Sequence, residues 1–179
     1  GNAIISSSFA NANTGFACGN GGTLIKTTNG GLNWFLLETQ IMTALYSIDA
    51  VDENNVFACG SGGYYIKTAD GGLTWQVFSY SVNEMTGIDF LDANTGFMGS
   101  QSDILKTTNG GINFTRYVPN YNSGITGISF VNSQTGYIAV GLGFRIQKTT
   151  NSGINWVNIY ASSSMGDNSS GILFINQST

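Results

Sequence analysis

The sequence predicts an all-β protein: a β-propeller, or a partial or open propeller array, made of four-stranded antiparallel blades. A short polar phrase returns four times, and its closing aromatic residues lie 41, 39 and 42 residues apart, at Trp34, Trp75, Phe114 and Trp156. A constant period near forty residues is typical of repeat architectures in which one supersecondary unit recurs. No window shows helical spacing, and 25 glycines with one proline fit short strands joined by tight turns.

Each repeat divides into four short strands separated by turn residues. The first strand alternates apolar and polar residues, as in Ile88-Asp89-Phe90, and a turn such as Asn94-Thr95-Gly96 follows it. The second strand is exemplified by Phe16–Gly19, and the third, such as Thr23–Thr27, comes after a glycine-rich turn. The repeated phrase is the next turn, and we expect the fourth strand to start at its closing aromatic. Four antiparallel strands at this period form one propeller blade.

The chain holds four full repeats and the first strand of a fifth. Gly171–Asn176 matches Gly127–Asn132, while the first repeat has its own weaker first strand around Ser7–Phe9. The last strand is therefore redundant for a ring of four. We expect a segment of a longer repeat array; the alternatives are a propeller that borrows or lends a strand and a piece cut at unit boundaries. An unpaired strand favours pairing within the molecule, with a continuation of the chain or with a neighbouring copy. We assign residues 1–179 to one repeat region, with repeats at about 4–43, 44–84, 85–124 and 125–169 and a partial fifth at 170–179.

The repeated phrase is interpreted as a folding device without a ligand of its own. Its Asp or Asn should cap backbone N–H groups within the turn, its glycine should take a positive φ, and its aromatic should pack across the hairpin. The positions concerned are Thr27, Asn29, Gly31, Trp34, Thr68, Asp70, Gly72, Trp75, Thr107, Asn109, Gly111, Phe114, Thr149, Asn151, Gly153 and Trp156.

These phrases resemble the Asp-box, or bacterial neuraminidase repeat, of sialidases, sortilin-type receptors and some glycanases. The longer consensus, from Thr14-Gly15-Phe16 to Trp34 in the first repeat, is most similar to the photosystem II stability/assembly factor repeat, which secreted bacterial proteins also carry. The resemblance covers nearly the whole chain and implies a β-propeller. The chain departs from it where Asn replaces Asp in three of four boxes, where Ser152 replaces a glycine and where Phe114 replaces Trp.

Composition and charge exclude several partners. Charged residues make up only 9% of the chain against about a quarter in typical domains, and the net charge is −4. Four of the six basic residues are lysines at one repeat position, so no basic patch is available for nucleic acid. No apolar run is long enough to span a membrane. The Asn-, Ser-, Thr- and Gly-rich composition favours an extracellular or cell-surface protein of bacterial type.

The chain offers little for catalysis or for cofactors. It has no His, which removes His-dependent triads and most transition-metal sites. Cys18 and Cys59 occupy equivalent positions in successive repeats, so we expect two buried, unbonded thiols. Two arginines cannot supply the three-arginine clamp that the resemblance to sialidases would require. Asp49 and Asp89 are equivalent first-strand acids, and we interpret them as solvated groups near the propeller axis rather than as a glycosidase pair. We therefore predict no catalytic, cofactor or metal site.

Recognition is the function that the sequence favours. Tyr117, Tyr121 and Tyr160 lie among Asn and Ser in the longest and least repetitive connections, which should share one face with the glycine-rich turns. Exposed tyrosines on variable segments of a regular scaffold suit protein or sugar surfaces; connections that merely absorb length are the alternative. We expect a non-enzymatic binding, adhesion or structural module. The other candidates are part of an Asp-box glycan hydrolase whose catalytic residues lie elsewhere and a photosystem assembly factor-like protein.

Overall fold

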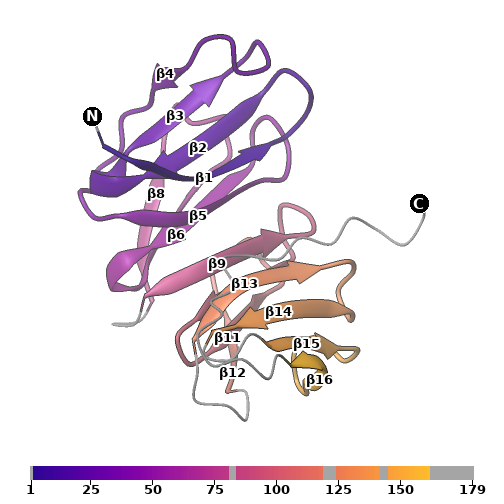
Figure 1. The fold of residues 1–179 in the computed structure, drawn as a ribbon. Helices are drawn as coiled ribbons and strands as arrows, with labels where there is room; N and C mark the ends of the chain where they lie inside the picture. The colour runs from indigo at the N-terminus through magenta and orange to yellow at the C-terminus, as the bar shows by residue number, and fades with distance from the viewer. Residues whose placement is uncertain (1, 81–83, 119–123, 142–144, 162–179) are drawn as a thin grey trace. The chain divides into compact units, whose positions relative to one another are not determined.

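A computed structural model describes residues 2–80, 84–118, 124–141 and 145–161 of the chain. The described residues form four four-stranded antiparallel sheets, each in the strand order of the sequence (Figure 1). The predicted all-β propeller class is confirmed, and each sheet is one blade. The only helical elements in these ranges are two single 3-10 turns, η1 (Asn20–Gly22) and η2 (Ser61–Gly63), between the second and third strands of their blades.

The chain divides into two compact units, residues 1–85 and 86–179. Blades 1 and 2 form the first unit, and blades 3 and 4 belong to the second. Blade 1 contains β1 (Ile4–Phe9), β2 (Gly15–Gly19), β3 (Leu24–Thr27) and β4 (Phe35–Leu36), and blade 2 contains β5 (Leu45–Ala50), β6 (Val56–Gly60), β7 (Tyr64–Thr68) and β8 (Gln76–Ser79). Blade 3 contains β9 (Met85–Phe90), β10 (Gly96–Ser100), β11 (Ile104–Thr107) and β12 (Thr115–Tyr117), and blade 4 contains β13 (Ile125–Phe130), β14 (Gly136–Val140), β15 (Arg145–Thr149) and β16 (Val157–Ala161).

The turn between the first two strands repeats the same side-chain cap in every blade. In blade 2, Asp52 Oδ1 accepts the backbone N–H groups of Asn54 and Asn55, both at 2.8 Å. Asp92 accepts the corresponding pair in blade 3, each at 2.7 Å. These bonds hold the pKa of the Asp92 carboxyl below its usual value. Asp52 and Asp92 therefore cap the turns that follow the first strands of their blades. Asn11 and Asn132 do the same in blades 1 and 4.

Within the first unit, β5 of blade 2 packs against β1 and β2 of blade 1 (Figure 1). Phe16, Cys18 and Leu45 are fully buried members of the apolar cluster that joins the two blades. The Cys18 thiol lies 3.5 Å from the Leu45 carbonyl oxygen. Ser8 Oγ accepts the backbone N–H of Ala50 at 3.0 Å, so a hydrogen bond between the two blades accompanies the apolar contact.

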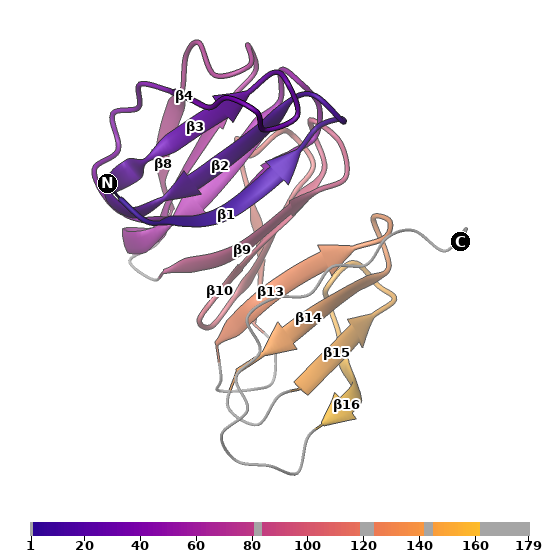
Figure 2. The ribbon, with the colours of Figure 1, turned by 45° about the horizontal axis from the view of Figure 1, so that its top comes forward.

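The second unit uses the same contact with larger side chains. Figure 2 shows β13 beside β10. Phe97 of β10 stacks on Phe130 of β13 with ring centroids 3.4 Å apart and an interplanar angle of 3°. The Asp89 carboxylate accepts the backbone N–H of Phe130. Asp89 therefore makes a hydrogen bond between blades 3 and 4, a structural role that the sequence interpretation had not assigned to it.

Several details of the sequence interpretation can be compared with the fold. The first strand of blade 1 is present, and Cys18 and Cys59 are buried and unbonded, as expected. Burial raises the pKa of the Cys18 thiol to about 12. The expected start of the fourth strands at the aromatic was wrong by one residue, because β4, β8, β12 and β16 begin just after it. The segment Gly171–Asn176 lies outside the described residues.

Candidate functional site

The repeated phrase forms one hydrogen-bonded turn. In blade 1, the buried Thr27 hydroxyl accepts the N–H groups of Asn29 at 3.3 Å and Gly31 at 2.9 Å and donates to Asn29 Oδ1 at 3.0 Å. The same Oδ1 accepts the N–H of Asn33 at 3.0 Å. The predicted capping role of Asn29 is therefore confirmed, and Thr27 shares it. The pattern recurs at Thr68, Asp70, Gly72 and Thr74, at Thr107, Asn109, Gly111 and Asn113, and at Thr149, Asn151, Gly153 and Asn155.

Positive φ angles explain the glycines of the turn. Gly30 and Gly31 have φ of 69° and 89°, in the left-handed region that favours glycine. Blade 4 departs from the pattern, because Ser152 has φ of 64° at the first of the two positions. Its hydroxyl donates to the carbonyl oxygen of Ser133, in another turn of the same blade, at 2.6 Å, and this bond helps a non-glycine residue to hold the conformation.

Two of the closing aromatics make edge-on ring contacts with the first strand of their own blade. Trp34 meets Phe9 edge-on with ring centroids 6.0 Å apart, and Trp156 meets Phe130 in the same way at 6.0 Å. Trp156 Nε1 also donates to the Gly153 carbonyl oxygen at 2.9 Å. The aromatic thereby ties each of these two turns to the first strand of its own blade.

Asp70 is the one carboxylate among the four box positions. The hydroxyl of Thr68 donates to it at 2.6 Å, and the hydroxyl and N–H of Thr74 donate at 2.5 and 2.9 Å. These bonds lower the pKa of the Asp70 carboxyl to about 2. The turn therefore works with a neutral amide or with a carboxylate, which accounts for Asn at the other three positions.

A lysine precedes each box and lies over an aromatic ring. Lys26 Nζ is 5.1 Å from the centroid of Phe16, and Lys106 and Lys148 lie 5.6 Å from the rings of Phe97 and Tyr137. Lys26 also donates to the Gly71 carbonyl oxygen of the next blade at 2.8 Å. In the described part of the chain, the ammonium groups of Lys106 and Lys148 have the ring contact but no hydrogen-bond or ion-pair partner.

Two half-open cavities lie beside these two lysines at equivalent places in blades 3 and 4. The cavity of blade 3 has a volume of about 250 Å³ and is lined by Lys106, Thr108, Asn109, Asn113, Phe114, Thr115 and Tyr117. That of blade 4 has about 290 Å³ and is lined by Lys148, Thr150, Asn151, Asn155, Val157 and Ile159. The blade 3 cavity combines an ammonium group, amides, hydroxyls and two aromatic rings. We refer to it below as the blade 3 pocket.

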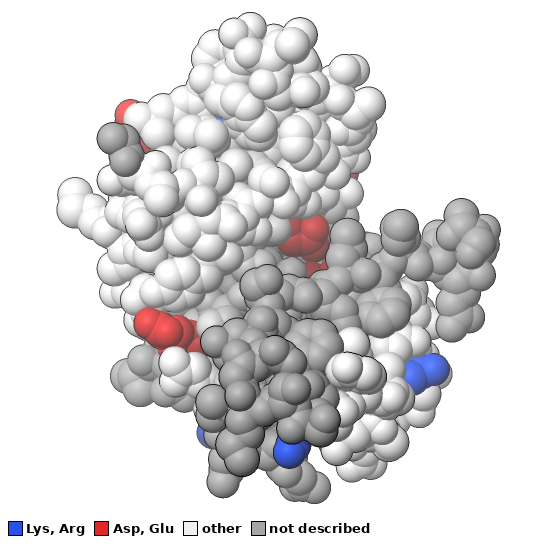
Figure 3. All heavy atoms as spheres, in the orientation of Figure 1, with Lys and Arg blue, Asp and Glu red and all other residues white. Residues whose placement is uncertain are grey.

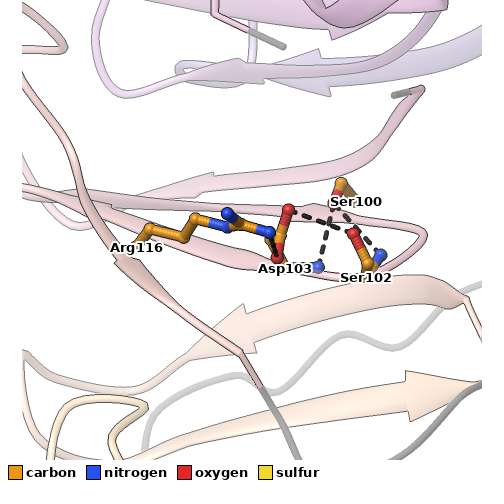
Figure 4. Close-up of polar contacts among 4 residues, drawn as sticks. All are labelled: Ser100, Ser102, Asp103 and Arg116. Atoms are coloured by element: carbon orange, nitrogen blue, oxygen red, sulfur yellow. Dashed lines mark hydrogen bonds and ion pairs between the residues drawn. The ribbon is translucent and has the colours of Figure 1, made fainter. Parts of the chain in front are cut away.

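An ion pair braces the strand that forms one wall of the blade 3 pocket (Figure 4). Arg116 Nη2 of β12 lies 2.8 Å from Asp103 Oδ1, and the Asp103 side chain is only 7% exposed. Ser102 Oγ donates to Asp103 Oδ2 at 3.0 Å, and Ser100 Oγ accepts the N–H groups of Ser102 and Asp103. Because side chains alternate along a strand, Arg116 holds β12 from the face opposite Thr115 and Tyr117. Sequence reasoning missed this pair; the polar Ser102-Asp103 where the first two blades have Gly-Gly was the available signal.

The three tyrosines proposed for a binding face have different positions. Tyr117 is half-buried at the end of β12, opposite Ile104, and lines the blade 3 pocket. Tyr160 is 52% exposed on β16, opposite Ile146. Both belong to fourth strands rather than to the connections that follow, which corrects their expected placement. Tyr121 lies outside the described residues.

On the face of the molecule that Figure 3 shows, charged side chains of the described residues are few, as the composition indicates. The turn tips instead carry an aliphatic residue directly after the box glycines in every blade. These residues are Leu32, Leu73, Ile112 and Ile154, and they are 57–86% exposed. Within the described ranges, no helix has the length and hydropathy of a membrane span. No group of three or more acidic, Cys or His side chains there could hold a metal ion.

Comparisons with known proteins identify the fold. No protein-family model matches the chain, and no curated protein does. A solved structure of YCF48 bound to D1 peptide matches with a TM-score of 0.73 and 18% identity, over 88% of this chain and 54% of that chain. YCF48 from Cyanidioschyzon merolae matches with a TM-score of 0.67 and 18% identity, over 87% and 58%. A GH74 enzyme from Niastella koreensis matches with a TM-score of 0.71 and 17% identity, over 86% and 28%.

These neighbours are β-propeller proteins, in agreement with the blade architecture. The chain spans little more than half the length of the YCF48 structures and about a quarter of the GH74 enzyme. At these identities the likeness extends to the fold alone. The predicted likeness to photosystem assembly factor and Asp-box propellers is supported at the level of the fold.

Proposed function

We propose that the chain is a non-enzymatic recognition module that binds a protein or glycan partner outside the cell. The observation that carries this proposal is the blade 3 pocket. There the Lys106 ammonium lies over the Phe97 ring but has no hydrogen-bond or ion-pair partner among the described residues, and amide, hydroxyl and aromatic groups line the pocket with it. Convergent polar groups with aromatic side chains in a concave site are typical of ligand sites. The exposed aliphatic turn tips add apolar area that a partner would bury.

Solved structures of the same fold also support a recognition function. One neighbour of the same fold is YCF48 bound to D1 peptide, which illustrates that this architecture can serve recognition. Extracellular or cell-surface location remains part of the proposal and rests on the uncharged, Asn- and Thr-rich surface. A glycan hydrolase is the second candidate, because a GH74 enzyme shares the fold.

Arrays of glycans and of surface proteins, probed with the labelled chain, test the recognition proposal. A specific hit that the Lys106→Gln variant weakens and that Lys26→Gln leaves unchanged is the expected result. Incubation of the chain with each glycan hit, followed by product analysis, separates the two candidates. Release of reducing ends that survives repurification, and that Asp89→Asn abolishes, would replace binding by hydrolysis.

The proposal extends to self-association through the segment Gly171–Asn176. In the described blades, the first strand of one blade packs on the preceding blade, and Leu45 and Ile125 are buried there. Ile4, at the matching place of blade 1, is 47% exposed. A strand supplied by a neighbouring copy fits such a face. Light scattering on the chain with and without residues 171–179 tests this, and equal masses at all concentrations would refute it.

A further inference from the structure

The lysine before the box has two different environments in otherwise equivalent blades. In the first unit, the Lys26 ammonium is bonded to the carbonyl oxygen of Gly71, the first box glycine of blade 2. In the second unit, the corresponding residue of blade 4 is Ser152, and Lys106 of blade 3 makes no such bond among the described residues. The lysine ammonium therefore makes a hydrogen bond within the protein in blade 1, whereas the equivalent ammonium of blade 3 remains available to a ligand.

The difference follows from one side chain. A Cβ atom added to Gly71 would lie 2.9 Å from Lys26 Nζ, closer than side-chain carbons pack. Glycine at this position thus permits the lysine to reach the carbonyl group. Ser152 has that Cβ atom at the same positive φ, so a lysine that approached the carbonyl group of Ser152 as Lys26 approaches that of Gly71 would meet it. By this comparison with blade 1, we expect the serine to keep the Lys106 ammonium from such a bond.

The other groups of the pocket define what the ammonium would meet. The hydroxyls of Thr108 and Thr115 and the side-chain amide of Asn113 have no partners within the described ranges, and the rings of Phe114 and Tyr117 complete the lining. A volume of about 250 Å³ is below the roughly 300–1,000 Å³ of sites for drug-sized ligands. It suits one ring-sized group that has an apolar face for the aromatic rings and several hydroxyls for the polar groups.

We infer that the blade 3 pocket binds a carboxylate-bearing sugar unit, a uronic acid residue of a glycan, with its carboxylate on Lys106. The sugar's hydroxyls meet Asn113, Thr108 and Thr115, and its C–H face lies against Tyr117. The inference rests on the proposed recognition function and names its ligand class. A single acidic peptide side chain would use the ammonium but would leave the hydroxyls and the amide without partners, which is why the pocket favours the sugar.

The matching cavity of blade 4 provides an internal comparison. It keeps Lys148, Thr150 and Asn155, but Val157 and Ile159 replace Thr115 and Tyr117. The aromatic platform and one hydroxyl are therefore missing. We expect the blade 4 cavity to attract the same carboxylate more weakly and without a ring stacked on the sugar.

The test is a titration followed by NMR, with methyl β-glucuronide as the acidic sugar, methyl β-glucoside as the neutral sugar and N-acetyl-glutamate methylamide as the peptide mimic. The full chain and its Lys106→Gln, Tyr117→Ala, Ser152→Gly and Lys26→Gln variants are compared. The glucuronide should bind at least about fivefold more tightly than the other two, as a charge-assisted bond adds to the polar contacts. Lys106→Gln and Tyr117→Ala should each abolish that preference or the binding itself, and Lys26→Gln should change neither.

Ser152→Gly is the decisive variant, because it leaves every lining residue in place. It should let Lys106 bond to the backbone of blade 4, lower the glucuronide affinity and slow the reaction of the Lys106 amine with a methylating reagent. An unchanged affinity and reactivity would overturn the role of Ser152. Equal binding of both sugars with no effect of Lys106→Gln, or preference for the peptide mimic, would overturn the ligand class while the recognition function stands. No binding of any probe would overturn the site, and the array experiment would still decide the proposed function on its own.

Discussion

The buried threonine of the box turn should contribute more to stability than its small size suggests. Replacing Thr27 by Val keeps the shape and removes the hydroxyl that accepts the N–H groups of Gly31 and Asn29. The 2.9 Å bond from Gly31 is the stronger of the two, and a donor left without an acceptor costs about 1–3 kcal/mol. The bond from Asn29 is longer, at 3.3 Å, and adds less. We expect a loss of about 2 kcal/mol in the free energy of unfolding.

Thr28→Val is the matched control, since Thr28 is exposed and adjacent, and its loss should stay within about 0.5 kcal/mol. Urea unfolding followed by tryptophan fluorescence gives both values, and a thermal melt should show Thr27→Val lower by about 4–8 °C. The reasoning is refuted if the two variants unfold at the same urea concentration. In that case the hydroxyl network would accompany the turn without stabilising it.

Three further predictions concern titration, packing and reactivity. The pKa of the Asp70 carboxyl is lowered to about 2, so its stabilising contribution is complete above the ordinary carboxyl range and is lost as the pH falls towards 2. Asp70→Asn should therefore reduce the loss of stability between pH 4 and pH 2, and Asn109→Asp should increase it. Equal urea midpoints for the two variants and the parent protein across that range would contradict this. Phe130→Ala removes a ring that is 4% exposed and stacked on Phe97, so calorimetry should show a free energy of unfolding lower by about 3–5 kcal/mol. Phe35→Ala, at an exposed position, should lower it by less than about 1 kcal/mol. Similar losses for the two variants would refute the packing argument. Burial raises the pKa of Cys18 and Cys59, so iodoacetamide at pH 8 should modify neither thiol in the native protein and both in urea, and rapid native labelling would contradict the buried environment.

The blade architecture could be predicted because local sequence and global repetition agree. Each box places Thr, Asn or Asp, and Gly where one turn needs an acceptor, a cap and a positive φ, and four copies remove the ambiguity of one. The strand starts were misjudged by one residue because Trp34 and its equivalents belong to the end of the turn. The hydrogen bonds that Ser8 and Asp89 make between blades depend on how strands about forty residues apart in the sequence pack together. The apolar and polar pattern of a single strand does not predict that packing.

The candidate site was predictable only in part. Tyr117 was singled out from its neighbours, but the pocket also needs Lys106 and Asn113, which look like ordinary members of the repeat. In our proposal, the availability of the Lys106 ammonium depends on Ser152. The sequence shows that this serine replaces a glycine, but its effect on the lysine can be argued only once blade 4 is placed beside blade 3. The Asp103–Arg116 pair likewise joins a residue of the turn before β11 to a residue of β12, and the departure from Gly-Gly at Ser102-Asp103 does not by itself indicate which residue Asp103 meets.

The box turns also control how fast two asparagines of this protein deamidate. Asn29-Gly30 and Asn109-Gly110 are of the dipeptide type in which the glycine nitrogen attacks the carbonyl carbon of the Asn side chain, ammonia leaves, and water then opens the ring to give a carboxylate. In the folded turn, that nitrogen donates instead to a carbonyl group of a neighbouring turn, from Gly30 to Asn13 and from Gly110 to Asn94, both at 2.8 Å. The Asn oxygen is held at the same time by the threonine and by the residue that follows the turn. Deamidation therefore requires the turn to open first, so the rate at which these two residues gain one dalton reports how often the box turns of blades 1 and 3 open.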